Sequence, residues 1–204
     1  MAINFSERSI VDFRSKMTGG GARSNLFEVT IEYPALLGLP TDPDGPKATG
    51  EFLIKAAEIP ASNLGNIPVP FRGRVLPVAG DRTFDPWTVT VINDTSFNIR
   101  DAMEQWSNSI NDLQFDGGIT SPAGYQTEAF VTQLGRINDN SGQLSSGSDN
   151  MQQIRQYKFF GIYPNTVSSI PLDYGATDQI EEFQVTFNYI YWTVASGSNI
   201  ASGG

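Results

Sequence analysis

Carboxylates are the most numerous side chains in this sequence that could perform chemistry. Asp and Glu number 22, whereas histidine and cysteine are both absent. A glycosidase needs two carboxyl groups, one of them in an apolar pocket that raises its pKa. No local pattern marks such a pair, and the absence of histidine removes the commonest general base and the usual zinc ligand. We therefore expect a protein that is not an enzyme and has no cofactor or metal site.

Two glycine-containing segments resemble ligand loops only in part. Asp42 and Asp44 stand two residues apart, as the first ligands of a calcium loop do. However, Pro46 takes the next ligand position, and Leu53 stands where such a loop needs a bidentate glutamate. An ordinary turn is therefore expected. The triplet at residues 19–21 lacks the Gly-Lys-Ser/Thr of a phosphate-binding loop, so it predicts a hinge.

The charge of the chain is negative and unevenly distributed. The net charge is −9, which argues against tight binding of nucleic acid, because affinity for phosphates comes from Lys and Arg. Residues 1–23 contain four basic and two acidic residues, whereas residues 165–204 contain four acids and no base. Two interpretations stay open: a solvated surface with chance clustering, or attraction between opposite ends of neighbouring subunits.

Alternating apolar and polar residues predict a mainly β protein. Trp87, Val89 and Val91 alternate with threonines, which is the period-2 pattern of a strand with two distinct faces. A Gly-Asp turn at residues 80–81 is expected to precede this strand. Similar patterns predict strands in residues 26–33, 51–58, 67–78, 125–134, 155–163 and 181–194.

Prolines modify two of these predicted strands. Three prolines within residues 67–78 place that strand at a sheet edge or a bend, because proline donates no hydrogen bond to a ladder. Pro164 is expected to end the strand of residues 155–163. Arg72 and Arg74 are two residues apart and would share one strand face. They are interpreted either as solvated side chains or as a strip that contacts another subunit.

One amphipathic helix is expected in residues 96–113. Its apolar residues recur at three- and four-residue spacing, which forms a single stripe: Ile99, Ala102, Met103, Trp106, Ile110 and Leu113. Asp94, Thr95 or Ser96 can supply the N-cap, and the glycines at 117–118 end the element. The helix is expected to cover the open end of a small β-barrel or sandwich of antiparallel strands.

The predicted organisation is one domain with a flexible segment at each end. Residues 1–22 form a flexible arm, residues 23–194 a single β-barrel domain, and residues 195–204 a disordered tail. Residues 139–150 contain one apolar residue in twelve and are expected to form a surface loop. No apolar run has the length of a membrane-spanning helix, and the start of the chain does not resemble a secretory signal.

Four blocks of the sequence resemble the tail tube protein family of contractile-tailed bacteriophages. They are RSNLFEVTIEY (23–33), IPVPF (67–71), the segment 78–94 with its GDRTFDPW string, and residues 160–187 with the GIYPNTV turn. The family is also similar to the haemolysin-coregulated protein of type VI secretion. The residues that carry the resemblance most specifically are Gly80, Asp81, Arg82, Phe84, Asp85, Trp87, Pro164 and Asn165.

The resemblance implies a structural subunit of the virion that is assembled in the host cytoplasm. Six copies would form a ring, and rings would stack head to tail into a hollow tube inside a contractile sheath. Implied partners are the sheath, baseplate, tail terminator and tape measure proteins, with DNA passing through the lumen without tight binding. A net-negative wall repels phosphate and lets the genome slide.

Two groups of residues are predicted to serve this assembly. Acids on strands near the start of the domain are candidates for the channel wall: Glu28, Glu32, Glu51 and Glu58. Basic residues of the arm are candidates for ordering on stacking: Arg8, Arg14, Lys16 and Arg23.

Four alternatives stay open from the sequence. A baseplate protein that initiates the tube, or the tube of a phage-derived injection machine, would share the fold. A carbohydrate-binding β-sandwich would be monomeric and would expose an aromatic platform. A carboxylate glycosidase would degrade peptidoglycan.

Overall fold

A computed structural model describes residues 10–17, 21–40, 45–115, 117–135 and 153–195 of the chain. The predicted loop at 139–150, residues 196–204 of the predicted tail and the Asp42–Asp44 pair lie outside the described residues. Among the helices of the described part, none is long and apolar enough to cross a membrane.

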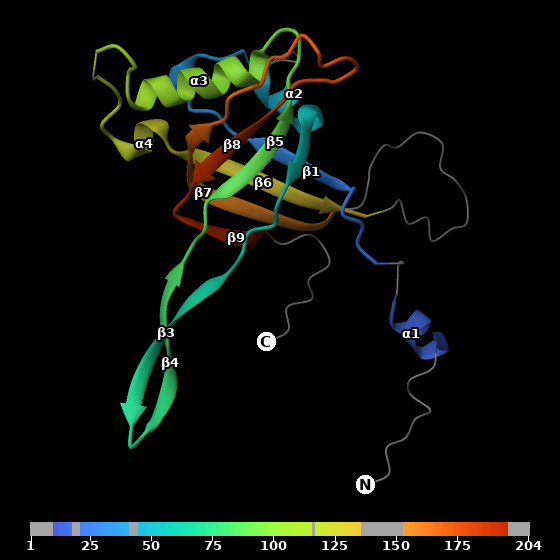
Figure 1. Ribbon diagram of the computed structural model, residues 1–204, viewed down its shortest axis with the longest axis vertical. Helices are drawn as coiled ribbons and strands as arrows, with labels where there is room; N and C mark the ends of the chain where they lie inside the picture. The colour runs from blue at the N-terminus through green and yellow to red at the C-terminus, as the bar shows by residue number, and fades with distance from the viewer. Residues whose placement is uncertain (1–9, 18–20, 41–44, 116, 136–152, 196–204) are drawn as a thin grey trace.

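Most strands belong to one antiparallel sheet of seven, with the order β1-β6-β7-β8-β5-β2 and with β9 also paired to β7 (Figure 1). Two further strands, β3 and β4, pair only with each other. The strand bounds are β1 Phe27–Ile31, β2 Ile54–Ala57, β3 Asn63–Phe71, β4 Arg74–Thr83, β5 Trp87–Ile92, β6 Thr127–Leu134, β7 Gln153–Val167, β8 Glu182–Asn188 and β9 Tyr191–Ala195. A mainly β fold is therefore confirmed.

The long strand β7 folds the sheet into two layers. Its first half lies between β6 and β9, whereas residues 163–167 pair with β8. Gly161 separates the halves at φ 66°, in the left-handed region that favours glycine. A Cβ there would also lie 2.5 Å from the Ile190 side chain. The two layers form a sandwich, but the pairing of the described strands does not close into the predicted barrel.

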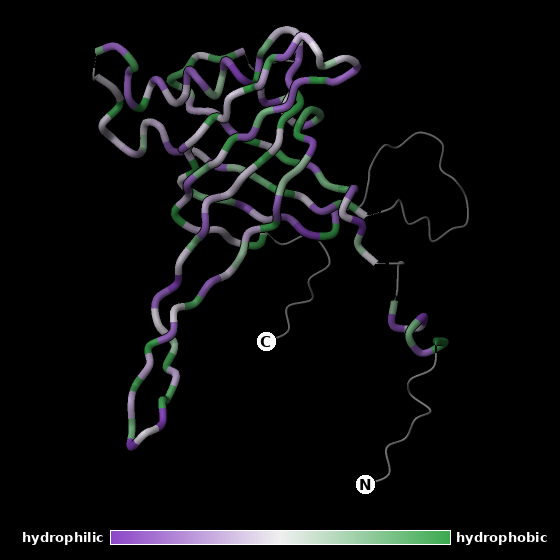
Figure 2. Tube along the Cα trace, viewed as in Figure 1, coloured by the Kyte–Doolittle hydropathy of each residue, from purple (hydrophilic) through white to green (hydrophobic). Residues whose placement is uncertain are grey.

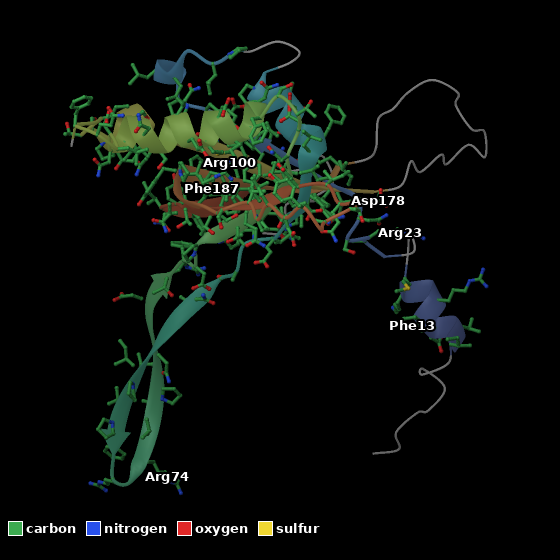
Figure 3. All side chains as sticks on the ribbon, turned by 45° about the horizontal axis from the view of Figure 1, so that its top comes forward. Phe13, Arg23, Arg74, Arg100, Asp178 and Phe187 are labelled. Atoms are coloured by element: carbon green, nitrogen blue, oxygen red, sulfur yellow. The ribbon has the colours of Figure 1, made fainter. Side chains whose placement is uncertain are left out.

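The core lies between the two layers and follows the predicted strand faces. Trp87, Val89 and Val91 are buried on β5, opposite the buried side chains of β8. Trp87 stacks on Phe159 of β7 with ring centroids 4.6 Å apart. Phe187 lies inside the sandwich (Figure 3). Period-2 alternation thus predicted which side of these strands is apolar.

Helix α3, Asn98–Ile110, lies across one end of the sandwich (Figure 1). Its buried residues are Ile99, Ala102, Met103 and Trp106, as the predicted stripe requires. Trp106 Nε1 donates a hydrogen bond to the Tyr125 carbonyl at 2.8 Å. Both predicted ends of the helix are wrong. The helix begins after Phe97, whose φ is 56°, and no side chain caps its first turn. It ends at Ile110, and Leu113 lies exposed beyond this end.

The other helices are short. They are α1 Ile10–Lys16, α2 Pro46–Leu53, α4 Pro122–Tyr125 and a 3₁₀ turn at Ala35–Leu37. Helix α2 corrects the strand predicted for residues 51–58, of which only Ile54–Ala57 is extended. Pro46 begins this helix, where the missing N–H of proline leaves no intrahelical bond unmade. Helix α2 packs on β1, so Glu51 faces that strand.

Two predicted strands differ from the structure in where they end or break. Pro164 does not stop β7, because it lies buried inside the strand opposite Phe187. The segment 181–194 is two strands, since the chain breaks at Tyr189–Ile190 between β8 and β9. Both strands pair with β7, in its second and first halves respectively. The alternating pattern of residues 181–194 therefore does not reveal the break at which the chain passes from one layer to the other.

Segment 67–78 is also two strands. It contains the tip of the β3–β4 hairpin, whose two-residue turn is Arg72-Gly73 with φ 47° and 78°. Positive φ at both central residues matches the twist of the flanking strands. The prolines therefore do lie on edge strands, as predicted. The prediction of a turn at Gly80-Asp81 is wrong, because both residues lie inside β4.

Candidate assembly surfaces

The described residues contain little that could perform chemistry. Within them, no group of three or more carboxylates is placed to hold a metal ion. Burial raises the pKa of the Tyr33 phenol above its ordinary value. Burial, and secondarily the charge of Asp85, also raises the pKa of Tyr189. A phenol is already neutral at pH 7 at its ordinary pKa, and the raised pKa makes both side chains still less suited to act as general bases.

The β3–β4 hairpin is the most prominent exposed feature of the molecule. It projects from the sandwich as a separate ribbon (Figure 1) and carries apolar residues along its length (Figure 2). Seven large apolar side chains on it are between 42% and 66% exposed: Leu64, Ile67, Val69, Phe71, Val75, Leu76 and Val78. A two-stranded ribbon of this kind is marginally stable by itself in water.

Both faces of the hairpin are apolar. Val69 lies opposite Leu76, and Ile67 opposite Val78, on one face, whereas Pro68 lies opposite Pro77 on the other. Arg74 lies at the tip (Figure 3), and Arg72 belongs to the turn, so the two do not lie along one strand face as predicted. The Arg72 guanidinium lies 5.3 Å from the centre of the Phe71 ring. Whether the two arginines contact another subunit stays a prediction.

The family-motif residues 80–87 attach the hairpin to the sandwich. The register of β3 and β4 shifts around Gly65 and Gly80, where a Cβ on Gly80 would lie 3.1 Å from the Gly65 backbone. Arg82 Nη1 donates to the Ser62 hydroxyl at 2.5 Å, and Asn63 donates to the Asp85 carboxylate at 2.5 Å. These contacts hold the two strands together where they leave the sandwich.

Two tryptophans secure the chain that leads into the hairpin. Trp87 Nε1 donates to the Glu58 carbonyl at 2.9 Å, and Trp192 Nε1 donates to the Ala61 carbonyl at 3.1 Å. Phe84 packs against Tyr189 with ring centroids 5.8 Å apart. The GDRTFDPW string therefore combines hairpin attachment with the start of the core strand β5.

The second part of the motif, Pro164-Asn165, forms an irregularity in β7. Pro164 pairs with Phe187, and the next paired residue is Thr166, so Asn165 is the extra residue of a bulge. Bulges bend a strand and increase its twist. This bulge lies within the half of β7 that belongs to the β5–β8 layer.

The four predicted wall acids do not form one cluster. Three of them surround the contact between β1 and α2. Glu32 accepts a hydrogen bond from Lys47 Nζ at 2.5 Å, Glu51 accepts one from the Thr30 hydroxyl at 3.1 Å, and Glu28 lies on β1 beside Glu51 in the same shallow hollow. Glu58 is exposed and separate, after β2. Their position relative to a channel stays a prediction.

The predicted stacking arm includes helix α1, which lies away from the sandwich (Figure 1). Arg14 and Lys16 are exposed on it, and Arg23 is exposed where the chain enters the sandwich. Arg8 lies outside the described residues. Ile10 and Phe13 on the same helix are also exposed, and Figure 3 shows this helix apart from the sandwich.

The sequence did not predict a second exposed apolar surface. It is the loop of residues 168–181, where Leu172, Tyr174 and Ile180 are exposed beside Asp173 and Asp178. This loop lies at the opposite end of the molecule from the hairpin (Figure 1). The cluster of acids in residues 165–204 was visible in the sequence, but its position at one end depends on the fold.

Comparison with known proteins gives one family over most of the chain. The sequence model of the phage tail tube protein family matches residues 22–195. Tail tube protein gp19 of Enterobacteria phage T4 is 33% identical over 181 residues, which are 88% of this chain and 95% of that protein.

Two solved structures share the fold. The first is the cryo-EM structure of the anti-feeding prophage (AFP) baseplate, 6-fold symmetrised. The match covers 87% of this chain and 97% of the solved chain, with a TM-score of 0.57 at 12% identity. The second is the PVC sheath-tube complex of an extracellular contractile injection system in the extended state, where the match covers 89% of this chain and 97% of the solved chain, with a TM-score of 0.52 at 11% identity. On the family match and the identity to the T4 protein, this chain belongs to the phage tail tube protein family.

Proposed function

We propose that this structural tail tube subunit forms hexameric rings that stack head to tail into a hollow tube inside a contractile sheath. The observation that carries the proposal is the β3–β4 hairpin, because its apolar faces are exposed in one copy. Apolar surfaces of this extent on a soluble protein mark contacts with other chains. Membership of the tail tube family and the six-fold symmetry of the AFP baseplate structure support the ring.

The hairpin can supply a useful part of the assembly energy. Full burial of a Val, Leu, Ile or Phe side chain stabilises by about 1.5–3 kcal/mol, so seven side chains that are about half exposed retain roughly 5–10 kcal/mol per hairpin. Part of this free energy offsets the loss of translational and rotational freedom on association. The remaining free energy is gained at every subunit of a tube, because each copy contributes its own hairpin and contacts the hairpin of a neighbour.

Unpaired strand edges provide a second type of contact. Among the described strands, β1, β2 and β9 each pair with one neighbour only, so each has an unpaired side. Unpaired edges are templates for strand pairing and hence for aggregation. A closed ring of identical copies pairs such edges with one another and ends the addition of subunits at a fixed number.

The two ends of the molecule fit head-to-tail stacking. The hairpin projects at one end, and the acidic loop of residues 168–181 with its exposed apolar side chains lies at the other (Figure 1). Contacts between unlike ends repeat without limit, so a tube grows until another protein ends it. The sheath, baseplate, tail terminator and tape measure proteins are the proposed partners, and DNA is the cargo. The subunit acts without catalysis.

The N-terminal arm is proposed to order when rings stack. Helix α1 carries two exposed cations, Arg14 and Lys16, and the opposite end of a neighbouring copy is acidic. Deletion of residues 1–18 should therefore abolish tubes and leave the sandwich folded. Negative-stain microscopy would score the tubes, and far-UV circular dichroism would score the fold. Unchanged tube formation by the deletion variant would refute the role of the arm.

Negative-stain microscopy of the purified full-length chain tests the proposed function as a whole. Long hollow tubes or six-fold rings are expected. A baseplate initiator is the second candidate, since the AFP baseplate shares the fold; it would form single rings that do not elongate at any concentration. A monomer at high concentration would contradict both.

A further inference from the structure

Helix α1 and a hollow on the sandwich have complementary features that stay unsatisfied within one copy. We infer that α1 of one copy docks into the hollow between β1 and α2 of a copy in the adjoining ring. This docking rests on the proposed tube and identifies the surface that the arm binds. It places Glu28 and Glu51, which the sequence suggested for the channel wall, in a contact between copies.

Helix α1 carries one apolar stripe with a cation on each side. Ile10, Phe13 and Met17 are spaced by three and four residues, which places them on one helix face. Met17 N donates to the Phe13 carbonyl at 3.1 Å, so it continues the last helical turn. The three side chains are 80%, 61% and 48% exposed respectively. Arg14, four residues after Ile10, and Lys16, three residues after Phe13, flank the stripe.

Helix α1 is too short to be stable by itself. It is seven residues long, and none of its residues is buried. Isolated helices shorter than about 12–15 residues are marginal in water, because the first turn costs more entropy than its hydrogen bond offsets. Figure 1 shows α1 apart from the sandwich of its own copy. A partner surface that covers the apolar stripe is therefore needed to hold the helix.

The hollow that suits this helix has a volume of about 240 Å³ and lies where α2, the start of β1 and the end of β6 meet. Phe52 lines it from α2 and is 87% exposed, so its ring is accessible to a second chain. The rest of the apolar lining comes from Leu26, Phe27 and Leu134. Hydrophobic grooves of this kind receive the apolar face of an amphipathic helix.

The hollow also contains two carboxylates without a cation. Glu28 lines it from β1 and Glu51 from α2, and neither belongs to an ion pair of the described residues. Glu51 accepts a hydrogen bond from the neutral Thr30 hydroxyl at 3.1 Å. An apolar surface with two carboxylates thus matches an apolar stripe with two cations, Arg14 and Lys16. Complementary charges of this type fix the orientation of a bound helix.

The positions of the arm and the hollow favour docking between rings. Figure 1 shows α1 displaced from the sandwich toward the end that carries the hairpin, whereas α2 lies at the other end. Head-to-tail stacking brings these two ends together. The chain advances eight residues from Met17 to Asn25, which lines the hollow of its own copy. Eight extended residues reach roughly 26–29 Å, about the diameter of a small domain, so the arm can span to the adjoining copy.

Disulfide cross-linking within tubes tests the proposed docking. The chain contains no cysteine, so introduced thiols are the only ones present. The Phe13→Cys, Phe52→Cys variant is assembled under reducing conditions, oxidised, and separated on a denaturing gel without reductant. We expect a ladder of covalent oligomers that continues beyond six copies, because each arm joins two rings. A mixture of the two single variants should give dimers only.

Three results would overturn the docking. A monomer with an internal disulfide would place the arm on its own copy, a ladder that ends at six would place the contact within one ring, and tubes without cross-links would exclude both. Phe13→Cys, Leu36→Cys is the matched control, since Leu36 is also highly exposed but lies outside the hollow. Equal cross-linking of this pair would show that the arm has no fixed site. Absence of tubes from the unmodified chain would instead refute the proposed function.

Charge reversal tests the same contact without changing its apolar side chains. Glu28→Lys, Glu51→Lys should raise the critical concentration for tube formation roughly tenfold, because two attractions become repulsions. Adding Arg14→Glu, Lys16→Glu to the same chain should recover most of this loss. Glu58→Lys is the control, since Glu58 is an exposed acid outside the hollow, and it should have little effect. An unchanged critical concentration for the hollow variant, or no recovery by the arm substitutions, would overturn the docking even if the cysteine variant does not assemble.

Discussion

Replacing two apolar residues of the hairpin by serine should weaken assembly without weakening the fold. Val69 and Leu76 form a cross-strand pair and are 42% and 61% exposed. At about 1.5–3 kcal/mol for complete burial of one side chain, burial of their exposed parts between copies would contribute about 1.5–3 kcal/mol in total. At ~1.4 kcal/mol per factor of ten, the Val69→Ser, Leu76→Ser variant should raise the critical concentration for tube formation by roughly 10- to 140-fold.

The assay is sedimentation of tubes over a series of protein concentrations. Thermal unfolding of the unassembled variant should change little, because both side chains lie outside the core cluster on the projecting hairpin. Leu113→Ser is the matched control, since Leu113 is an exposed leucine that lies outside the hairpin. An unchanged critical concentration for the hairpin variant would refute the role of the hairpin. A large loss of monomer stability would show that the two side chains belong to the fold of one copy.

Three further predictions concern the stability of the sandwich. Trp106→Ala should lower the free energy of unfolding in urea by about 3–5 kcal/mol, because it empties a fully buried site and removes the bond to the Tyr125 carbonyl; a loss below 1 kcal/mol would contradict this packing. Gly161→Ala should cost about 1–3 kcal/mol in the same assay, owing to its positive φ and the nearby Ile190 side chain. Burial raises the pKa of Tyr33, so the phenol stays protonated in the fold at a pH at which it ionises in the unfolded chain. Stability should therefore fall as the pH rises above about 10, and Tyr33→Phe should reduce this fall.

The faces of individual strands could be predicted because they depend on local periodicity. Trp87, Val89 and Val91 are buried as their alternation requires, and so are Val29 and Ile31 on β1. The stripe of α3 is local information of the same kind. Its ends were wrong because an N-cap depends on the path of the backbone, and Phe97 enters the helix at positive φ.

The layers could not be predicted, because they depend on pairing between distant segments. Alternation continues through residues 181–194, although the chain leaves one layer and enters the other at Tyr189–Ile190. Pro164 was expected to end β7, yet a bulge at Asn165 accommodates it next to β8. In both cases the neighbouring strand decides the outcome.

The assembly surfaces were predicted in part. The sequence indicates that the motif at residues 80–87 is specific, but its role in attaching a projecting hairpin depends on the contacts of Arg82 and Asp85 with residues at the start of β3. Arg72-Gly73 is a weak turn signal compared with Asn-Gly, and the sequence pattern therefore predicts one strand over residues 67–78 in place of the hairpin. The sequence pattern does not reveal that Lys47 of α2 pairs with Glu32, because this contact depends on how α2 packs beside β1.

A cryo-EM reconstruction of tubes grown from the purified chain tests the central claim most directly. We expect a hollow tube of stacked six-fold rings in which each β3–β4 hairpin lies against another copy. A tube in which the hairpins extend into solvent, or a particle that contains a single copy at every concentration, would contradict the account.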